Sequence, residues 1–389
     1  MEIDRPTGLL GGLTPAAFMR RHWQKKPLLV RAALADPLPG FDRRRLFALA
    51  AREDVESRLV VRDGERWSLR PGPIARRALP PLVVPGWSLL VQGVDLHDDA
   101  AHALLQRFRF VPDARLDDVM VSYASDGGGV GPHVDSYDVF LLQLAGRRRW
   151  RIGRVARPRL RADVPLKMLD GFAASDEWLL DPGDMLYLPP GWGHDGIAEG
   201  PCLTASIGFR APDAVGLAAD ALQRLAEAAL DARDEAAGGR RPGNPLYADR
   251  SQPATGSPAR IPTALQRFAD AAMERVAADV GARQRALGEA LSEPKPGTWF
   301  VRAQAARLDG GLVLDRRSRM LYDDAFVYLN GESFRAGGRD ATLMRAFADA
   351  RRLEAERVGR LSAEARGLLE RWLEDGWCRD EAGMGDRDG

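Results

Sequence analysis

The chain has 389 residues, of which 45% are hydrophobic and 29% charged, and its formal net charge is +1. This composition is typical of a globular protein with an adequate core, and the length suggests two or three domains. The absence of any apolar run of roughly 18 residues excludes a membrane-spanning helix, and the acidic N-terminus and the presence of only two cysteines favour a reducing cytoplasm over secretion.

The first part of the chain, residues 1–105, reads as a mixed α/β extension. Thr14 and Pro15 predict a helix start, because threonine caps a first turn and proline fits its first position. Short apolar or alternating runs bounded by Gly, Pro and Asp predict three strands in this part. They lie at residues 28–30, 58–62 and 87–91.

The next region, about 106–212, is dense in strand and turn signals. Its predicted strands lie at residues 119–122, 139–144, 149–152, 185–188 and 203–209. Many short strands without intervening helices indicate a sandwich or a barrel. We therefore expect one domain over residues 1–212, in which the N-terminal extension supports a jelly-roll core.

Composition changes abruptly after residue 212. Residues 213–236 are rich in alanine and leucine and predict a helix, and residues 238–262 predict a loop. A second amphipathic helix is expected over 265–291 and ends before Pro294. The apolar stripes of this segment, 213–293, suit either a buried core or a dimer surface.

The last part, residues 294–389, combines predicted strands near 311–314 and 326–329 with predicted helices at about 341–355 and 362–375. Strands beside helices in so short a segment predict a small winged-helix-like domain. Neither the net charge nor a clear recognition helix indicates DNA binding. We expect a domain that contacts protein or supports a dimer, without direct nucleic-acid binding.

The main chemical signal is the pair His133 and Asp135 together with the distant His194. An H-x-D pair in an extended strand projects both side chains from one face. With one further histidine it matches the facial triad of non-haem Fe(II) oxygenases, which leaves open positions on the metal, whereas a catalytic zinc site leaves one. Isolated H-x-D pairs are common by chance as surface residues or helix caps. Here two of only five histidines fall in barrel-like turns, which favours an iron site.

A second signal is the basic strand that follows, where Trp150 and Ile152 alternate with arginines. If these two apolar residues face the interior, the period of two turns Arg148 inward and its neighbouring arginines outward. A buried arginine is costly unless it meets an anion, and a bound dicarboxylate would offer bidentate geometry. The alternative is an ordinary basic strand in which Arg148 pairs with a protein carboxylate.

Several further segments carry a family resemblance. They are residues 21–28 (RHWQKKPL), 56–60 (ESRLV), 87–92 (WSLLVQ), 117–122 (DDVMVS), 136–140 (SYDVF) and 206–212 (SIGFRAP). With the triad, they make the chain resemble the JmjC-type cupin oxygenases that use Fe(II) and 2-oxoglutarate, in particular the bacterial ribosomal protein arginine hydroxylases. The resemblance is specific over residues 17–212 and beyond that rests on domain order. Ser136 departs from the glutamine that the family pattern has after the H-x-D aspartate.

The resemblance implies an α+β protein: a double-stranded β-helix (cupin/JmjC jelly roll), a helical dimerisation segment and a winged-helix-like C-terminal domain. It also implies Fe(II), with 2-oxoglutarate and O2 as cosubstrates, and a homodimer. The implied iron ligands, which are also the catalytic residues, are His133, Asp135 and His194. The implied or candidate cosubstrate-binding residues are Ser122, Arg148, Thr204 and Ser206, and the candidate substrate-binding residues are Asp118, Tyr137 and Asp138.

These observations lead to the hypothesis of a cytoplasmic 2-oxoglutarate-dependent dioxygenase, a protein arginine hydroxylase. The expected substrate is an arginine of the large-subunit ribosomal protein numbered sixteen. One alternative is hydroxylation of a histidine in another ribosomal protein with the same iron site. Others are a non-catalytic cupin that binds or regulates, which the complete triad disfavours, and a metal-dependent isomerase or dioxygenase of the cupin type.

Overall fold

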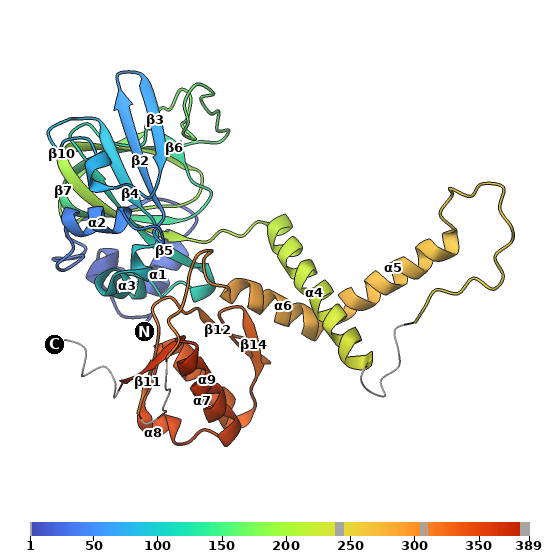
Figure 1. Ribbon diagram of the computed structural model, residues 1–389. Helices are drawn as coiled ribbons and strands as arrows, with labels where there is room; N and C mark the ends of the chain where they lie inside the picture. Colours follow the sequence, from blue (N-terminus) through green and yellow to red (C-terminus); the bar gives the residue numbers. More distant parts are fainter. Residues whose placement is uncertain (1, 238–244, 304–307, 309, 382–389) are drawn as a thin grey trace. The chain divides into compact units, whose positions relative to one another are not determined.

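The computed structural model describes residues 2–237, 245–303, 308 and 310–381. The chain divides into two compact units, Met1–Ala211 and Pro212–Gly389 (Figure 1). Within the described ranges, no helix is both long enough and apolar enough to cross a membrane.

The first unit is built from strands, with three α-helices and four short 3-10 turns. Its strands are β1 (Leu28–Val30), β2 (Ser57–Asp63), β3 (Arg66–Pro71), β4 (Trp87–Val91), β5 (Leu116–Ala124), β6 (His133–Val134), β7 (Val139–Arg154), β8 (Asp176–Leu180), β9 (Met185–Leu188) and β10 (Trp192–Phe209). Its α-helices are α1 (Pro15–Arg21), α2 (Arg43–Ala50) and α3 (Asp99–Gln106), and the 3-10 turns are η1 (Gly8–Leu10), η2 (Arg76–Ala78), η3 (Val94–Leu96) and η4 (Asp113–Arg115).

The strands pair antiparallel in the order β1-β9-β7-β10-β5-β4-β2-β3, while β6 joins β10 and β8 joins β7. The two long strands β7 and β10 pair along most of their length but change register between Glu199 and Leu203. Opposite this shift Gly146 has a φ of 62°, and a Cβ there would lie 2.2 Å from the Pro201 carbonyl oxygen. A bulge of this kind bends both strands. Beyond the shift, residues 147–154 of β7 and 192–199 of β10 are the far halves of these strands. Together with β6 and β8 they form the second, smaller wall of the barrel.

Side-chain alternation divides these walls into an inner and an outer face. The inner face holds an apolar layer together with polar side chains, among them Ser122, Gln143, Arg148, Thr204 and His194, all buried. The apolar layer consists of Val139, Leu141, Trp150, Ile152, Leu180, Leu186 and Leu188. The jelly roll expected from the sequence is therefore confirmed, and it encloses a polar site.

The outer face of the larger wall packs on the N-terminal helices, which supply Phe18, Leu46 and Leu104 to the main core. Each helix begins at a side-chain cap: Thr14 accepts from Ala17 N in α1, Asp42 from Arg44 N in α2 and Asp98 from Ala101 N in α3. Such caps stabilise a short helix by about 1 kcal/mol each. Of these helices, α2 and α3 were not predicted from the sequence.

The second unit begins with helices α4 (Ala214–Ala237), α5 (Thr263–Ala278) and α6 (Val280–Ser292). The single helix predicted over 265–291 is wrong, because the chain leaves the helical conformation at Asp279, with ψ at 102°, and the Asp279 carboxylate caps α6 at Ala282 N. Residues 238–244 of the predicted loop lie outside the described residues.

The rest of the second unit is a small α+β domain around Phe347, Leu369 and Trp372. Its strands are β11 (Leu312–Leu314), β12 (Met320–Tyr322), β13 (Phe326–Leu329), β14 (Glu332–Arg335), β15 (Arg352–Leu353) and β16 (Cys378–Asp380), and its helices are α7 (Gly338–Ala350), α8 (Ala355–Val358) and α9 (Ala363–Glu374). The helix predicted to run to residue 355 ends earlier, because Arg351 adopts a left-handed φ of 55° and begins a turn into β15.

Candidate functional site

Three ligand-type side chains meet inside the barrel. His133 lies on β6 and His194 on β10, and the two are direct partners across the antiparallel pair. Asp135 follows β6, so its carboxylate reaches the same place. One ligand atom from each of the three residues lies within 4.8 Å of the others. This is the convergence that the H-x-D spacing and the distant histidine predicted.

The backbone sets which ring nitrogen of each histidine faces the cluster. His133 Nδ1 lies 3.0 Å from the Gly131 carbonyl oxygen and His194 Nδ1 lies 3.2 Å from the Trp192 carbonyl oxygen. A carbonyl only accepts, so each Nδ1 carries the proton and each Nε2 keeps a lone pair. His194 Nε2 lies 3.6 Å from Asp135 Oδ2. Such backbone anchoring is typical of metal-ligating imidazoles.

Burial places these groups in the state that binds a metal. Burial, followed by the nearby His133, lowers the pKa of His194 well below its usual value and keeps the ring neutral. Burial also raises the pKa of Asp135, and the adjacent His133 offsets only part of this. A carboxylate destabilised by burial gains most from a cation beside it. Two neutral imidazoles and one carboxylate therefore fit a divalent metal bound on one face.

The glycine-rich loop before His133 is closely packed against its neighbours. Gly127 N donates to the Ala198 carbonyl at 3.0 Å, and a Cβ on Gly128 would lie 2.4 Å from the Trp87 carbonyl oxygen. A Cβ on Gly129 would lie 2.5 Å from the Gly196 carbonyl oxygen. The close approach of β4 and β10 therefore requires glycines here. The loop positions His133 through tight backbone packing.

The interior also buries one arginine. Arg148 is 6% exposed and points inward, whereas the side chains of Arg147, Arg149 and Arg151 are 54%, 40% and 41% exposed and pair with acidic residues on the outer face. Arg148 Nη1 donates to the Ser122 hydroxyl at 3.2 Å and to the Thr204 hydroxyl at 3.3 Å. Its guanidinium carbon lies 5.4 Å from the centre of the Trp150 ring.

Arg148 has no carboxylate within ion-pair distance among the described residues, and its Nε is buried without a partner. The alternative of a protein carboxylate for Arg148 is therefore wrong. A buried guanidinium with only neutral hydroxyl partners keeps a large desolvation cost. An anionic ligand beside the guanidinium would remove that cost through charge-assisted hydrogen bonds.

Gln143 and Trp150 also contact this group of residues, Gln143 through Thr204 and Trp150 through Arg148, and the sequence did not predict either as a site residue. The Thr204 hydroxyl donates to Gln143 Oε1 at 3.0 Å, and the Gln143 amide donates to the Ala145 carbonyl at 2.9 Å. Gln143 therefore orients the Thr204 hydroxyl so that its lone pairs face Arg148. A polar residue in the inward row of an apolar strand was the sequence signal for it. Ser206 lies two residues beyond Thr204 on the same face of β10 and is 9% exposed.

The three candidate substrate residues lie in different environments. Tyr137 is 39% exposed, and burial of its hydroxyl, then the charges of Asp135, Asp118 and Asp117, raise its pKa. Asp118 is 2% exposed, and its Oδ2 accepts from Gln92 Nε2 at 2.8 Å and Gly93 N at 2.9 Å. Tyr137 and Asp118 thus share a negatively charged region beside Asp135.

Asp138 lies apart from that region. It is fully buried with the outer core, where Tyr187 donates to its Oδ1 at 2.6 Å and Gln24 donates to its Oδ2 at 3.1 Å. Arg115 adds an ion pair at 3.5 Å. Both oxygens are therefore engaged in a network that ties the N-terminal extension to the barrel, and the structure does not support the expectation that Asp138 binds substrate.

Two segments of the chain match known families. Residues 103–217 match the JmjC domain, and residues 282–379 match the ROXA-like winged helix. Among curated proteins, the chain is 41% identical over 197 residues to the Ribosomal protein uL16 3-hydroxylase of Escherichia coli, covering 50% of this chain and 52% of that protein. It is 38% identical over 206 residues to the Probable ribosomal oxygenase of Haemophilus influenzae, covering 52% of this chain and 50% of that protein. The chain spans about half the length of these curated relatives.

Solved structures extend the similarity over nearly the whole chain. The X-ray structure of E. coli ycfD is 30% identical with a TM-score of 0.79, and the match covers 95% of this chain and 98% of that one. The structure of YcfD in complex with cobalt and 2-oxoglutarate matches with a TM-score of 0.75 at 30% identity and the same coverage of each chain, 95% and 98%. The winged-helix-like C-terminal domain expected from the sequence is confirmed by these matches.

Proposed function

Since the chain belongs to the JmjC-domain ribosomal oxygenases, we propose that it is a 2-oxoglutarate- and Fe(II)-dependent dioxygenase that hydroxylates an arginine of the large-subunit ribosomal protein uL16. The observation that carries the proposal is a pair of sites inside one barrel: a two-histidine, one-carboxylate cluster and a buried arginine without a carboxylate partner among the described residues. Iron with 2-oxoglutarate and O2 supplies, when bound, the oxidising power to insert oxygen into an unactivated C–H bond.

The residues divide the work of binding. His133, Asp135 and His194 hold the metal, and the backbone carbonyls behind the two rings keep each Nε2 directed at it. Arg148 binds the distal carboxylate of 2-oxoglutarate, with Ser122 and Thr204 orienting the guanidinium. Ser206 completes this wall of the pocket. The surrounding apolar layer excludes water, which strengthens each charged contact.

An arginine target is supported by charge around the site mouth. Tyr137 lies close enough to Asp135, Asp118 and Asp117 for their charges to raise its pKa. A guanidinium entering there meets negative potential and an aromatic side chain, a combination that favours planar cations. We therefore assign Tyr137 and Asp118 to substrate binding and leave Asp138 to the structural network.

The second unit suits a homodimer. Its helices carry exposed apolar side chains, including Leu222 at 58%, Met273 at 63% and Val280 at 55% exposure. Covering such a stripe with a second copy of the chain would remove this apolar surface from water. Light scattering on the purified chain should give a mass twice that of the monomer. The double variant Met273→Asp with Leu222→Asp should give the mass of a single chain.

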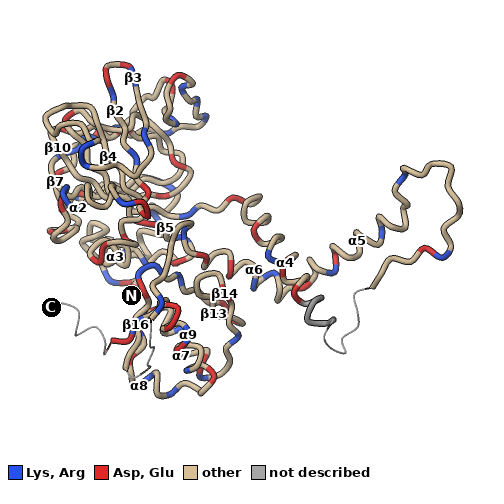
Figure 2. The backbone as a smooth tube through the Cα atoms, viewed as in Figure 1, with Lys and Arg blue, Asp and Glu red and all other residues tan. Residues whose placement is uncertain are grey.

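A cytoplasmic enzyme that recognises protein and not nucleic acid fits the remaining features. Cys202 and Cys378 are both free and buried, as in a reducing compartment. Basic and acidic residues are interspersed along the chain (Figure 2), in keeping with a net charge of +1. A ribosomal partner would then be recognised through its protein surface.

The test is incubation of the purified chain with Fe(II), 2-oxoglutarate and peptides that span each arginine of uL16. Mass spectrometry should find the gain of one oxygen atom on one arginine, with succinate formed in step. Peptides centred on histidines of other ribosomal proteins serve as the competing substrates. If only the histidine peptides gain oxygen, the protein is a histidine hydroxylase and the arginine assignment is wrong. If no peptide gains oxygen and no succinate forms, the hydroxylase proposal is rejected.

A further inference from the structure

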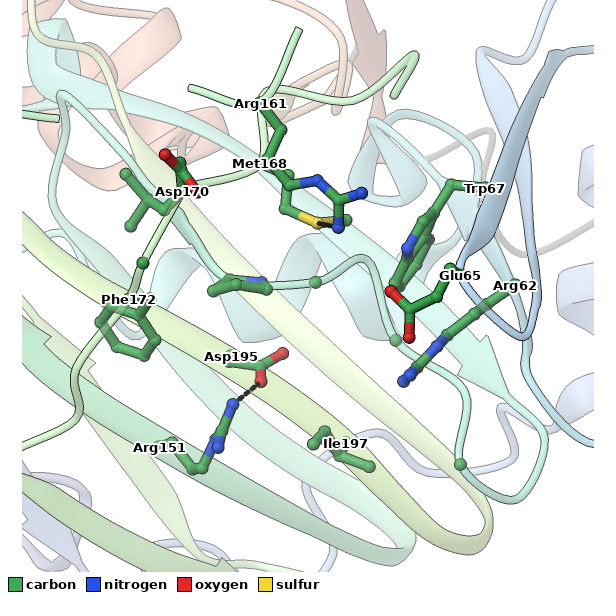
Figure 3. A pocket seen from close by; sticks show the side chains of 16 residues that line it. Arg62, Glu65, Trp67, Arg151, Arg161, Met168, Asp170, Phe172, Asp195 and Ile197 are labelled. Carbon is green, nitrogen blue, oxygen red and sulfur yellow. Dashed lines mark hydrogen bonds and ion pairs between the residues drawn. The ribbon is translucent and has the colours of Figure 1, made fainter. Parts of the chain in front are cut away.

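A cavity of about 520 Å³ lies outside the metal site, on the outer face of the wall that the far halves of β7 and β10 form. Its lining comes from the β2–β3 hairpin, the glycine-rich loop, the segment between β7 and β8, and the outer face of β7 and β10. Figure 3 shows Trp67 and Glu65 on one side, Phe172 and Asp170 on the other, and Asp195 with Arg151 between them.

This cavity is separate from the metal ligands but shares their backbone supports. None of His133, Asp135 and His194 lines it. Gly131 and Pro132 form part of its wall and directly precede His133, while Asp195 follows His194 and points to the opposite face of β10. A segment bound here would therefore lie along the loop that leads to the metal ligands.

Asp195 is a charged group built into the cavity. It is 4% exposed, and its Oδ2 accepts from Arg151 Nη2 at 2.7 Å. The lining cation Arg151 therefore holds this carboxylate through one of its two oxygens. Figure 3 places this carboxylate between the two side walls.

Two of the three cations of the lining pair with carboxylates, and the third, Arg62, is held by a backbone carbonyl and an aromatic ring. Arg151 pairs with Asp195, and Arg161 pairs with Asp163 at 2.5 Å. Arg62 donates to the Gly64 carbonyl at 3.0 Å and stands 5.6 Å from the centre of the Trp67 ring.

The acceptors of the lining are less occupied. Glu65 has a longer-range attraction to Arg161 and no ion pair in the part of the chain that the structure describes. Asp170 pairs at 3.2 Å with Arg159, whose side chain is 79% exposed, so that pair contributes little. What remains available is a set of carboxylate oxygens between two aromatic walls, which suits a cationic side chain better than an anion.

We propose that this cavity binds an arginine or lysine side chain of the protein substrate, a few residues from the hydroxylated position. The proposal rests on the proposed function and adds a specificity site to it. Asp195 and Glu65 accept hydrogen bonds from the incoming cation, and Trp67 and Phe172 contact its alkyl stem. The shared glycine-rich loop aligns the bound segment with the metal site. Selection of substrate then depends on a basic residue near the target as well as on the target itself.

The experiment compares Glu65→Gln and Trp67→Ala with a matched control, Asp63→Asn, which removes the same charge from the same hairpin outside the cavity lining. Steady-state hydroxylation is measured with a uL16 peptide and with versions in which each flanking Arg or Lys is replaced by Gln. In Glu65→Gln and Trp67→Ala, KM for the native peptide should rise about three- to tenfold with kcat unchanged. For one of the flanking positions, replacement by Gln should raise KM in the wild type by a similar factor. With that replaced peptide, the wild type and the two variants should have the same KM.

Equal KM values for the wild type, Glu65→Gln and Trp67→Ala would overturn the proposal while leaving hydroxylase activity established. A rise in KM for Asp63→Asn equal to that for Glu65→Gln would also overturn it, because the effect would then be general electrostatics. If the wild type hydroxylates no peptide, the proposed function fails, and calorimetric titration of the same uL16 peptide judges the cavity by itself. Weaker binding by Glu65→Gln than by Asp63→Asn would support the cavity, and equal binding would reject it.

Discussion

The Arg148 guanidinium and the Thr204 hydroxyl are joined by a 3.3 Å hydrogen bond inside the barrel, and no carboxylate of the described residues neutralises the arginine. The bond holds a positive charge at a defined point of an interior whose other polar side chains are neutral hydroxyls and amides near it. A charge in this position is destabilising for the empty protein and favourable for an anionic ligand. Specific consequences follow for cosubstrate binding and for stability.

Replacement of Arg148 by Met should abolish most cosubstrate binding. The two charge-assisted hydrogen bonds that a carboxylate would lose contribute about 1.5–3 kcal/mol each, so KM for 2-oxoglutarate should rise by on the order of a hundredfold or more. Thermal unfolding of the ligand-free variant should occur at the same or a higher temperature, because a buried uncompensated charge has been removed. Succinate formation and calorimetry measure the two effects.

Arg149→Met is the matched control for that substitution. Arg149 neighbours Arg148 on β7 but points outward and pairs with Glu177 at 2.5 Å. Its loss should leave KM for 2-oxoglutarate unchanged. If both variants weakened 2-oxoglutarate equally, the inward orientation of Arg148 would not be the basis of binding.

Thr204→Val should weaken 2-oxoglutarate more gently. The valine has nearly the same shape but neither accepts from Arg148 nor donates to Gln143, so the guanidinium keeps Ser122 as its hydroxyl partner. One neutral hydrogen bond contributes about 0.5–1.5 kcal/mol, which predicts a rise in KM of about two- to tenfold. Thr204→Ser retains the hydroxyl and should restore the wild-type value. A serine variant as weak as the valine variant would show that side-chain shape matters here and the hydrogen bond does not.

Metal binding should depend on the triad and should stabilise the first unit. Cobalt(II) added to the metal-free chain should raise its unfolding temperature, because a hundredfold excess over Kd adds about 2.7 kcal/mol to the free energy of unfolding. EDTA should reverse the shift. His133→Ala removes one of the three ligands and should abolish the shift and the visible absorption of bound cobalt. An unchanged shift in His133→Ala would place the metal elsewhere.

The sequence predicted the His133 and Asp135 pair and the inward arginine because both follow from a period of two. Trp150 and Ile152 lie on the inner face, so the alternation also places Arg148 there. Asp138 was expected at the substrate only from its position beside the H-x-D pair, and that position did not contain its contacts with Gln24, Arg115 and Tyr187.

Other features depended on tertiary contacts that a linear pattern does not contain. The outer cavity joins Trp67, Met168 and Asp195, which come from three separate segments of the chain. The break between α5 and α6 depends on the single carboxylate of Asp279, within an apolar stripe that continues on both sides. Local capping outweighed the periodic signal there.

Asp315 should be the main acid-sensitive residue of the small C-terminal domain. It follows β11, is 3% exposed, and pairs with Arg317 at 2.8 Å and with Arg379 of β16. Burial alone would raise the pKa of Asp315, but the hydrogen bonds and charge of Arg317, with the charge of Arg379, outweigh it and hold that pKa below its usual value of 3.8. The folded state therefore binds this proton less readily than the unfolded chain, and the charged form contributes stability.

Asp315→Asn should lower the free energy of unfolding of this unit by about 2–3 kcal/mol at neutral pH, since it leaves Arg317 and Arg379 without their shared carboxylate. A depressed pKa contributes in full above the unfolded value near 4 and is lost as the pH falls through the folded value. The difference between wild type and variant should therefore be constant from neutral pH down to about pH 5 and shrink below about pH 4. Calorimetric unfolding of the full chain across this range measures it. The control is Glu370→Gln, which removes the same charge from the exposed face of α9. It should lower the free energy of unfolding by less than about 0.5 kcal/mol at every pH. A loss in this control as large as that in Asp315→Asn would mean that net charge, and not the Asp315 cluster, sets the stability.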